Sequence, residues 1–442
     1  MEPRNTTSIE LYIDSLGPIR NSQIVLKPFL VFSGESGTGK SYTALLVHYL
    51  YKVICYDGIL EFFNHLKVSY DELLKQEPSQ GAETKEKLLY QFTLSQFEEW
   101  CNASALNYLK EMLGNYSLEG KISIKFQGIP SSYTFRYKRE TVEMNGEKIY
   151  SDVITLNETS SLRLPFRSSE WGKLPFTALF GTYLKTSLHI PQESTFILPP
   201  SRGGLVSLSD TGRNAFMTAP GGMYKEFISD FSDLKAAQPK NVDAEKRYSQ
   251  LSQSLIKGKI NIKDNDLYYE QAFGEIPITA GAASVKELAP FVLMLQKGLI
   301  GDYSVMFEEP ETNLHPELQI RVADTLVYLL QQGCRFQITT HSDYFLRRIN
   351  DLIRLDILKN KLTTEAYQEL CYAHHYLPEL TLDKRLIGAY YFKRTSETEV
   401  HIIHQEAGNG IPFDTFQSVL HNQLKDSSYI YDKMCESDET VD

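Results

Sequence analysis

The residues with the clearest chemical role form one glycine-rich run, Gly34-Glu35-Ser36-Gly37-Thr38-Gly39-Lys40-Ser41. The run fits the pattern GxxxxGK(S/T) without a mismatch, and its glycines expose successive backbone N–H groups that can cradle phosphate oxygens. Lys40 is expected to reach the β- and γ-phosphates of ATP, and Ser41 is expected to ligate Mg²⁺. All eight residues are therefore predicted to bind the nucleotide. The alternative, a chance glycine-rich turn, is disfavoured because an apolar strand precedes the run and a helical pattern follows it.

Two adjacent carboxylates are the second feature with a definite chemistry. Residues 304–311 read Ser-Val-Met-Phe-Glu-Glu-Pro-Glu, an apolar strand that ends in Glu308 and Glu309. On a strand that neighbours the P-loop strand, Glu308 would hold Mg²⁺, directly or through water, and Glu309 would act as the catalytic base that polarises the attacking water. The alternative is a pair of solvated charges in a turn. Glu311 is left open, because it also suits the start of the next loop.

A histidine follows another apolar strand, in the run Ile338-Thr339-Thr340-His341-Ser342. It comes one helix after the carboxylate strand, so an adjacent strand can direct it towards the γ-phosphate. A neutral imidazole at that place can sense phosphate and position water, which predicts a catalytic role for His341. A purely structural histidine is the alternative.

These residues need an α/β scaffold to bring them together. Apolar runs predict strands at 29–32, 195–198, 304–307, 335–339, 389–394 and 400–404. Helical periodicity predicts helices at 42–54, 284–297 and 316–331, and a helical arm at 222–262. Asn145-Gly146 predicts a hairpin turn between two alternating segments.

Changes of pattern along the chain predict five regions. They are the N-terminal part of an ATPase head with the P-loop at 1–60, a helical and β insertion at 61–190, a core strand with a helical arm at 191–275, the C-terminal part of the head at 276–420, and a C-terminal helix with an acidic tail at 421–442.

Composition limits the other functions. The chain has 442 residues and a formal net charge of -11, which disfavours nonspecific coating of nucleic acid. Its five cysteines show no CxxC spacing, so neither a disulfide framework nor a zinc site is indicated. No apolar run approaches the roughly 18 residues of a membrane span, and the first residues lack the apolar stretch of a signal peptide. We therefore expect a cytoplasmic protein without a membrane partner.

Together the three motifs resemble the ABC-type ATPases of the branch that holds SMC-like proteins and overcoming-lysogenization-defect (OLD) proteins. The run Glu308-Glu309-Pro310-Glu311-Thr312-Asn313-Leu314-His315-Pro316 is similar to the form common in OLD-like ATPases. The resemblance covers roughly 8–50 and 275–420. It implies an ABC-type head with mixed parallel and antiparallel sheets, an inserted helical and β-hairpin subdomain, and hydrolysis of ATP to ADP and phosphate.

The resemblance also implies that ATP binds between two heads of a homodimer or a higher homo-oligomer. The segment that would serve as the signature is 279–288, where Ser284 would face the γ-phosphate bound to the other head. Ser284 and Glu287 are expected to form a capping box at a helix start. The usual Ser-Gly pair is replaced by Ala283-Ser284-Val285, and Glu308 stands where many ABC proteins carry Asp. No glutamine matches the Q-loop. Ser201-Arg202 suits either a contact at the nucleotide edge or a plain turn.

The chain lacks the long coiled coil of repair ATPases and is too short for the nuclease domain of OLD proteins. It is similar in this respect to the ATPase subunits of two-gene anti-phage systems such as PARIS and Septu, which implies a scaffold or sensor that controls a separate nuclease- or toxin-like effector. The alternative is a DNA repair or DNA-end-processing ATPase; a transporter ATPase fits least well. The dense basic candidates for DNA contact are Lys121, Lys125, Arg136, Lys138 and Arg139, which also suit a solvated face.

Overall fold

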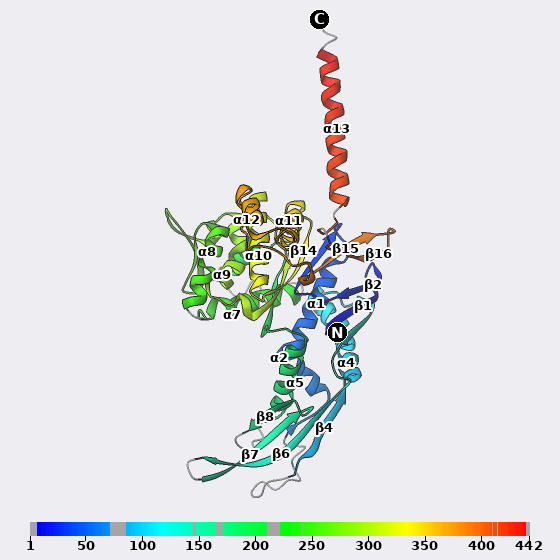
Figure 1. Cartoon of the computed structure of the whole chain (residues 1–442), viewed down its shortest axis with the longest axis vertical. Coiled ribbons are helices and arrows are strands. Elements are labelled where there is room, and N and C mark those ends of the chain that lie inside the picture. Colours follow the sequence, from blue (N-terminus) through cyan, green and yellow to red (C-terminus); the bar gives the residue numbers. More distant parts are fainter. Residues whose placement is uncertain are drawn as a thin grey trace.

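The computed structural model describes residues 7–70, 85–144, 147–164, 171–209, 222–240, 242–408, 410–412 and 414–438. The described chain forms a central α/β body, a β-rich extension on one side of it and one helix that projects from the other side (Figure 1). Its sheets contain both parallel and antiparallel pairs, so the predicted α/β class with mixed sheets is confirmed.

A nine-stranded sheet organises the body, in the order β5-β1-β2-β16-β15-β3-β14-β13-β9. Its parallel part consists of β15 (Ile387–Arg394), β3 (Phe29–Gly34), β14 (Arg335–Thr340), β13 (Tyr303–Glu308) and β9 (Ser194–Leu198). The remaining strands are β1 (Ser8–Leu16), β2 (Ile19–Val25), β5 (Gly120–Gln127) and β16 (Val400–Gln405). Parallel strands are covered on both faces, which explains the continuous apolar runs in their sequences.

The P-loop strand contributes to two cores because its side chains alternate between the faces of the sheet. Leu30 and Phe32 pack on the face covered by α1 (Lys40–Ile54). Phe29 and Val31 pack on the opposite face. That second face is covered by α9 (Ala283–Gln296), α10 (Pro316–Gln331) and α11 (Asp343–Lys359), and α12 (Thr364–Ala373) follows α11.

The extension is built on a four-stranded antiparallel sheet in the order β4-β6-β7-β8. Its strands are β4 (Lys87–Thr93), β6 (Ser132–Met144), β7 (Glu147–Leu156) and β8 (Ser160–Leu164), and its helices are α2 (Tyr56–His65), α4 (Leu94–Leu113) and α5 (Leu174–Ser187). The ring of Phe180 lies 4.8–6.4 Å from five aromatic rings of these elements, so an aromatic core joins them. The predicted turn Asn145-Gly146 lies outside the described residues, although the flanking strands do pair in register.

The predicted arm at 222–262 is two helices and a strand. The helices are α7 (Gly222–Ala236) and α8 (Val242–Ile256). A three-stranded sheet follows, with β10 (Lys259–Lys263), β11 (Asp266–Gln271) and β12 (Gly274–Pro277). The helical prediction is therefore wrong after Ile256, because Lys-Ile-Asn-Ile-Lys alternates with the period of a strand.

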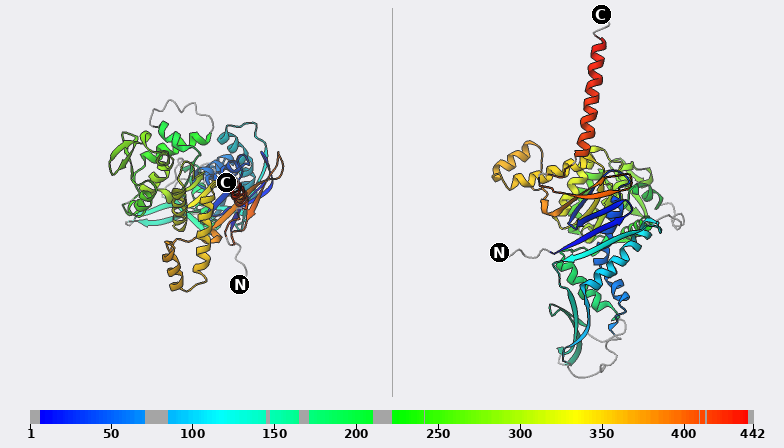
Figure 2. Two further views of the ribbon diagram at one scale, coloured as in Figure 1. Left: turned by 90° about the horizontal axis from the view of Figure 1, so that it is seen from above. Right: turned by 90° about the vertical axis from the view of Figure 1, so that its right-hand side faces the viewer.

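The last helix, α13 (Asp414–Asp438), projects away from the body (Figure 1 and the right-hand view of Figure 2). Leu424, Ile430, Tyr431 and Met434 are each about 60% exposed on it, at 59%, 59%, 67% and 60%. Exposed apolar side chains of this size on one helix are typical of a surface that contacts another protein. Among the described helices, none has both the length and the apolar character needed to cross a membrane.

Candidate active site

The phosphate loop connects β3 to α1, and its shape requires glycine. Gly34, Gly37 and Gly39 have φ values of 136°, 72° and 94°, in the range that favours glycine. A Cβ atom on Gly34 would lie 2.6 Å from the carbonyl oxygen of Phe392, and one on Gly39 would lie 2.8 Å from a methyl of Ile19. The loop therefore keeps a bare backbone, which is what close approach of phosphate oxygens needs.

The start of α1 is available to an anion. Gly39 is the N-cap and supplies no side-chain hydrogen bond to the first N–H groups of the helix. The Lys40 Nζ atom donates to the carbonyl oxygens of Gly34, at 3.0 Å, and Glu35, at 2.7 Å, so the amine lies against the loop. Burial lowers the pKa of Lys40 to about 8, while Glu309, Glu308 and Glu311 act to raise it. The lysine and the distant carboxylates thus share one electrostatic environment.

The carboxylate strand is one strand further from the loop than predicted. β14 lies between β3 and β13, so the expectation that the carboxylates occupy the neighbouring strand is wrong. The three strands are parallel and in register, with Glu308 opposite Thr339 and Thr340 opposite Ser33. Their carboxyl ends therefore meet at one edge of the sheet, beside the loop.

Ser41 and Glu308, the two residues predicted to ligate a metal, lie next to each other. The Ser41 hydroxyl is hydrogen-bonded to the Glu308 carboxylate, and burial raises the pKa of Glu308 to about 7. The Glu308 Oε1 atom is buried and has no hydrogen-bond partner among the described residues. Such an oxygen suits a cation. Within the described part of the chain, no cluster of three His, Cys, Asp or Glu could hold a metal by itself, and Mg²⁺ needs none because it takes most ligands from water and phosphate.

Glu309 and His341 line the same cavity as the phosphate loop. The cavity measures about 250 Å³ and is also lined by Lys40, Ser41 and Thr339. Glu309 has a φ of 42°, and its backbone N–H donates to the Thr339 carbonyl oxygen at 3.0 Å. Burial, and then Lys40, lower the pKa of His341, so its imidazole stays neutral at neutral pH. The structure therefore brings together the predicted P-loop, base and histidine.

Glu311, which the sequence left open, holds the main chain that carries the histidine. Its Oε1 atom accepts hydrogen bonds from Thr340 Oγ1 at 2.9 Å and from the His341 backbone N–H at 2.6 Å. Burial raises the pKa of this carboxyl. The only signal in the sequence is a third glutamate after Pro310, which does not reveal a contact with a strand 30 residues away.

Arg202 does not reach the nucleotide edge. Its side chain is completely buried and donates to three backbone carbonyl oxygens, those of Pro199, Glu287 and Glu308. The predicted edge contact is therefore wrong for this residue. It packs behind the carboxylates, on the side of β13 away from solvent, where its guanidinium lies 4.6 Å from the centre of the Phe307 ring.

Ser284 lies away from the P-loop of its own chain. It lines a separate cavity of about 480 Å³ with Phe273, His315 and Arg321. The predicted capping box is wrong: α9 begins at Ala283, its N-cap is Ala282, and no side chain caps it. Glu287 is instead buried, where its Oε1 atom accepts a hydrogen bond from Asn313 Nδ2 at 3.0 Å. A role for Ser284 at a second head stays a prediction.

The fold places a glycine-rich phosphate loop beside two carboxylates and a histidine, and a family comparison supports an ATPase domain in part of the chain. Residues 223–346 match the AAA_15 family model, described as an AAA ATPase domain. This segment contains Ser284, Glu308, Glu309 and His341, whereas the P-loop lies outside it. The match covers less than half of the chain and supports the prediction of an ATPase over this segment.

Three solved SMC head structures were also matched. One is the SmcHead bound to the C-winged helix domain of ScpA, with 11% identity, a TM-score of 0.35 and coverage of 91% of this chain and 98% of that one. The SMC head domain from Thermotoga maritima has 10% identity, a TM-score of 0.32 and coverage of 90% and 99%. The Smc head domain with an extended coiled coil, bound to the C-terminal domain of ScpA derived from Pyrococcus furiosus, has 10% identity, a TM-score of 0.36 and coverage of 94% of this chain and 99% of that one. No curated protein matched the chain.

Replacing the loop lysine tests the nucleotide site. Lys40→Ala removes the cation at the end of the loop and should weaken ATP binding by about 100-fold or more, since each hydrogen bond to a charged group contributes about 1.5–3 kcal/mol. Titration with a fluorescent ATP analogue measures this. Lys52→Ala is the matched control, because Lys52 lies on the same helix and pairs with Glu226. Unchanged affinity in Lys40→Ala would refute the assignment.

Proposed function

We propose that this protein is an ABC-type ATPase that binds and hydrolyses ATP with Mg²⁺ and thereby controls a separately encoded effector protein, in bacterial anti-phage defence in the cytoplasm. The observation that carries the ATPase part is the shared cavity, in which the P-loop meets Glu309 and His341, with Glu308 beside Ser41. These residues come from segments about 270 residues apart in sequence. A nucleotide site gives one reason for so many polar groups to gather at one sheet edge.

Each residue then has a defined task. Backbone N–H groups from Gly34 to Ser41 hold the phosphates, with Lys40 on the β- and γ-phosphates. Ser41 and Glu308 would hold Mg²⁺, which would supply positive charge against the phosphate oxygens. Glu309 accepts the proton of the attacking water, and neutral His341 contacts the γ-phosphate. Glu309 is suited to this task because its backbone is fixed to Thr339 while its carboxylate lines the cavity.

A second copy of the chain completes the site in this proposal. The start of α9, with Ser284, lies outside the cavity of its own P-loop. Ala282 and Ala283 are exposed there and leave the first N–H groups of the helix uncapped. An uncapped helix start is suited to bind the γ-phosphate held by another head. Homodimerisation, or a higher homo-oligomer built from such pairs, follows from this arrangement.

The projecting helix α13 supports control of a partner protein. A lone helix is marginal in water and gains most of its stability by packing an apolar stripe against another element. On α13, Leu424, Ile430, Tyr431 and Met434 share one side at helical spacing and are exposed. A separately encoded effector that covers this stripe would be held by the ATPase and released when nucleotide changes the head.

The DNA-processing alternative loses its main candidates. All five basic residues named from the sequence have acidic partners: Lys121 with Asp14, Lys125 with Glu98, Arg136 with Glu158, Lys138 with Glu140, and Arg139 with Asp152. Ion pairs of this kind weaken the pull on phosphate. They favour the interpretation of a solvated face over a DNA-binding surface.

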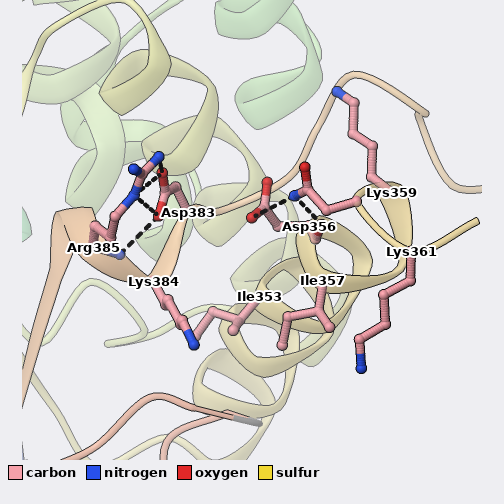
Figure 3. A pocket seen from close by; sticks show the side chains of 9 residues that line it. Ile353, Asp356, Ile357, Lys359, Lys361, Asp383, Lys384 and Arg385 are labelled. Atoms are coloured by element: carbon pink, nitrogen blue, oxygen red, sulfur yellow. Dashed lines mark hydrogen bonds and ion pairs between the residues drawn. The ribbon is translucent and has the colours of Figure 1, made fainter.

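One basic cavity still favours that alternative. It measures about 600 Å³ and lies between the end of α11 and residues 383–385 (Figure 3). Arg385 is paired with Asp383, whereas Lys359, Lys361 and Lys384 make no ion pair within the described part of the chain. A DNA-processing enzyme requires turnover that DNA stimulates and binding that falls steeply with salt. The proposed effector-controlling ATPase requires neither.

Glu309→Gln tests the catalytic base. The amide cannot accept a proton, so hydrolysis should fall by about 100-fold or more while ATP affinity stays near that of the wild type. Release of inorganic phosphate and ATP titration measure the two quantities. Glu158→Gln, at an exposed residue of the extension paired with Arg136, is the control. Undiminished turnover in Glu309→Gln would rule out this residue as the base.

Introducing charged side chains on the apolar stripe of α13 tests the partner surface. Leu424→Lys combined with Ile430→Lys places two charges on the apolar stripe and should abolish co-purification of the protein encoded by the neighbouring gene, with ATP turnover within about twofold of the wild type. Asn422→Lys combined with Tyr429→Lys adds the same charges on the other side of the helix and should retain the partner. Equal retention by both pairs would contradict this use of α13.

A further inference from the structure

A buried arginine joins three elements behind the catalytic carboxylates. Arg202 begins α6 (Arg202–Ser209) and has no exposed side-chain surface. Its Nε atom donates to the carbonyl oxygen of Glu287 on α9, at 2.9 Å. Its Nη1 atom donates to the carbonyl oxygens of Pro199, at 3.1 Å, and of Glu308, at 2.9 Å. One guanidinium thus fixes the main chain of the metal-binding strand end relative to the first turns of α9.

The carboxylate of Glu287 adds a second connection. It is 3% exposed, and its Oε2 atom lies 3.7 Å from Arg202 Nε. Its Oε1 atom accepts from Asn313 Nδ2, and Asn313 has a φ of 57° in the loop that follows Glu309. A Cβ atom on Gly203 would lie 3.0 Å from Glu287 Oε1, so the glycine permits this close approach. Glu287 therefore contacts both the arginine and the loop that leaves the active site.

The cost of this arrangement argues for a purpose beyond stability. Burial lowers the pKa of Arg202 to about 10, so the residue remains charged at neutral pH. Two charges removed from water contribute little net stability compared with apolar residues of the same shape. They do impose geometry, because each hydrogen bond has a fixed direction. In this protein the hydrogen bonds of Arg202 fix the position of the Glu308 main chain relative to α9.

We propose that Arg202 and Glu287 are positioning residues that couple the start of α9 to the catalytic carboxylates. This inference rests on the proposed ATPase function and deepens it. Ser284 lies three residues before Glu287 on α9, so a displacement of the helix start is transmitted through Arg202 to the Glu308 carbonyl and through Asn313 to the loop after Glu309. When a second copy of this chain docks on the start of α9, the carboxylates reach their working position.

Conservative variants of the full chain test the coupling. Arg202→Lys keeps a charge but loses the fork of donors, and Glu287→Gln keeps the shape but loses the charge. Each should lower the kcat for ATP by about tenfold or more and leave the affinity for ATP within about threefold. Because the two act as one unit, the double variant should lose little more than the worse single variant.

Arg348→Lys is the matched control. Arg348 pairs with Asp324 through two hydrogen bonds of 2.6 and 3.0 Å between α11 and α10, away from the cavity. Arg348→Lys should lower the melting temperature, as Arg202→Lys and Glu287→Gln do, but should leave the kcat for ATP unchanged. If Arg202→Lys does not fold, Glu287→Gln still decides the matter.

The outcomes separate the two proposals. Absence of ATP turnover in the wild type would contradict the proposed ATPase function itself. If the wild type turns over ATP, three results would overturn the coupling alone. They are an unchanged kcat in Glu287→Gln, equal losses of ATP affinity and kcat in the single variants, and additive losses of kcat in the double variant.

Discussion

The site depends on an imbalance of charge at the carboxyl edge of the parallel sheet. Lys40 and the buried guanidinium of Arg202 both lie in the field of Glu308, Glu309 and Glu311, three carboxylates against two cations. Burial raises the pKa of Glu308 to about 7 and raises that of Glu311, since a carboxylate removed from water is harder to ionise. A divalent cation bound beside Glu308 would supply positive charge to these carboxylates, and the bare backbone of the loop would hold phosphate oxygens. The electrostatics and the geometry therefore both support the proposed binding of a metal and a nucleotide.

Two groups of contacts keep this edge in shape from behind. Glu311 accepts hydrogen bonds from the Thr340 hydroxyl, at the end of β14, and from the His341 backbone N–H, and Arg202 donates to the carbonyl oxygen of Glu308 on β13. Neither Glu311 nor Arg202 lines the cavity of the phosphate loop. Glu311 is bonded to His341, which does line it, and Arg202 is bonded to Glu308, the neighbour of Glu309. These contacts fix the main chain of the site, while the Glu309 side chain, which accepts a hydrogen bond from Thr312 Oγ1 at 3.1 Å, lines the cavity together with His341.

The sequence correctly predicted those features that depend on a short run of neighbouring residues. The P-loop, the strand ending in Glu308 and Glu309, and the helix at 316–331 are set by local patterns of glycine, apolar side chains and helical period. It failed where long-range packing decides. The capping box at Ser284 and Glu287 did not form because Glu287 is drawn into the core by Arg202 and Asn313, and the insertion of β14 between β3 and β13 is a matter of topology. The role of Glu311 depends on a strand that no local pattern connects to it.

The most direct test of the account is the effect of Mg²⁺ on ATP affinity in the wild type and in Glu308→Gln, measured by calorimetric titration with and without the metal. The account predicts that Mg²⁺ strengthens binding to the wild type by about tenfold or more, and that Glu308→Gln loses this gain but keeps the metal-free affinity. An equal gain from Mg²⁺ in both proteins, or no binding of ATP to the wild type, would contradict the account.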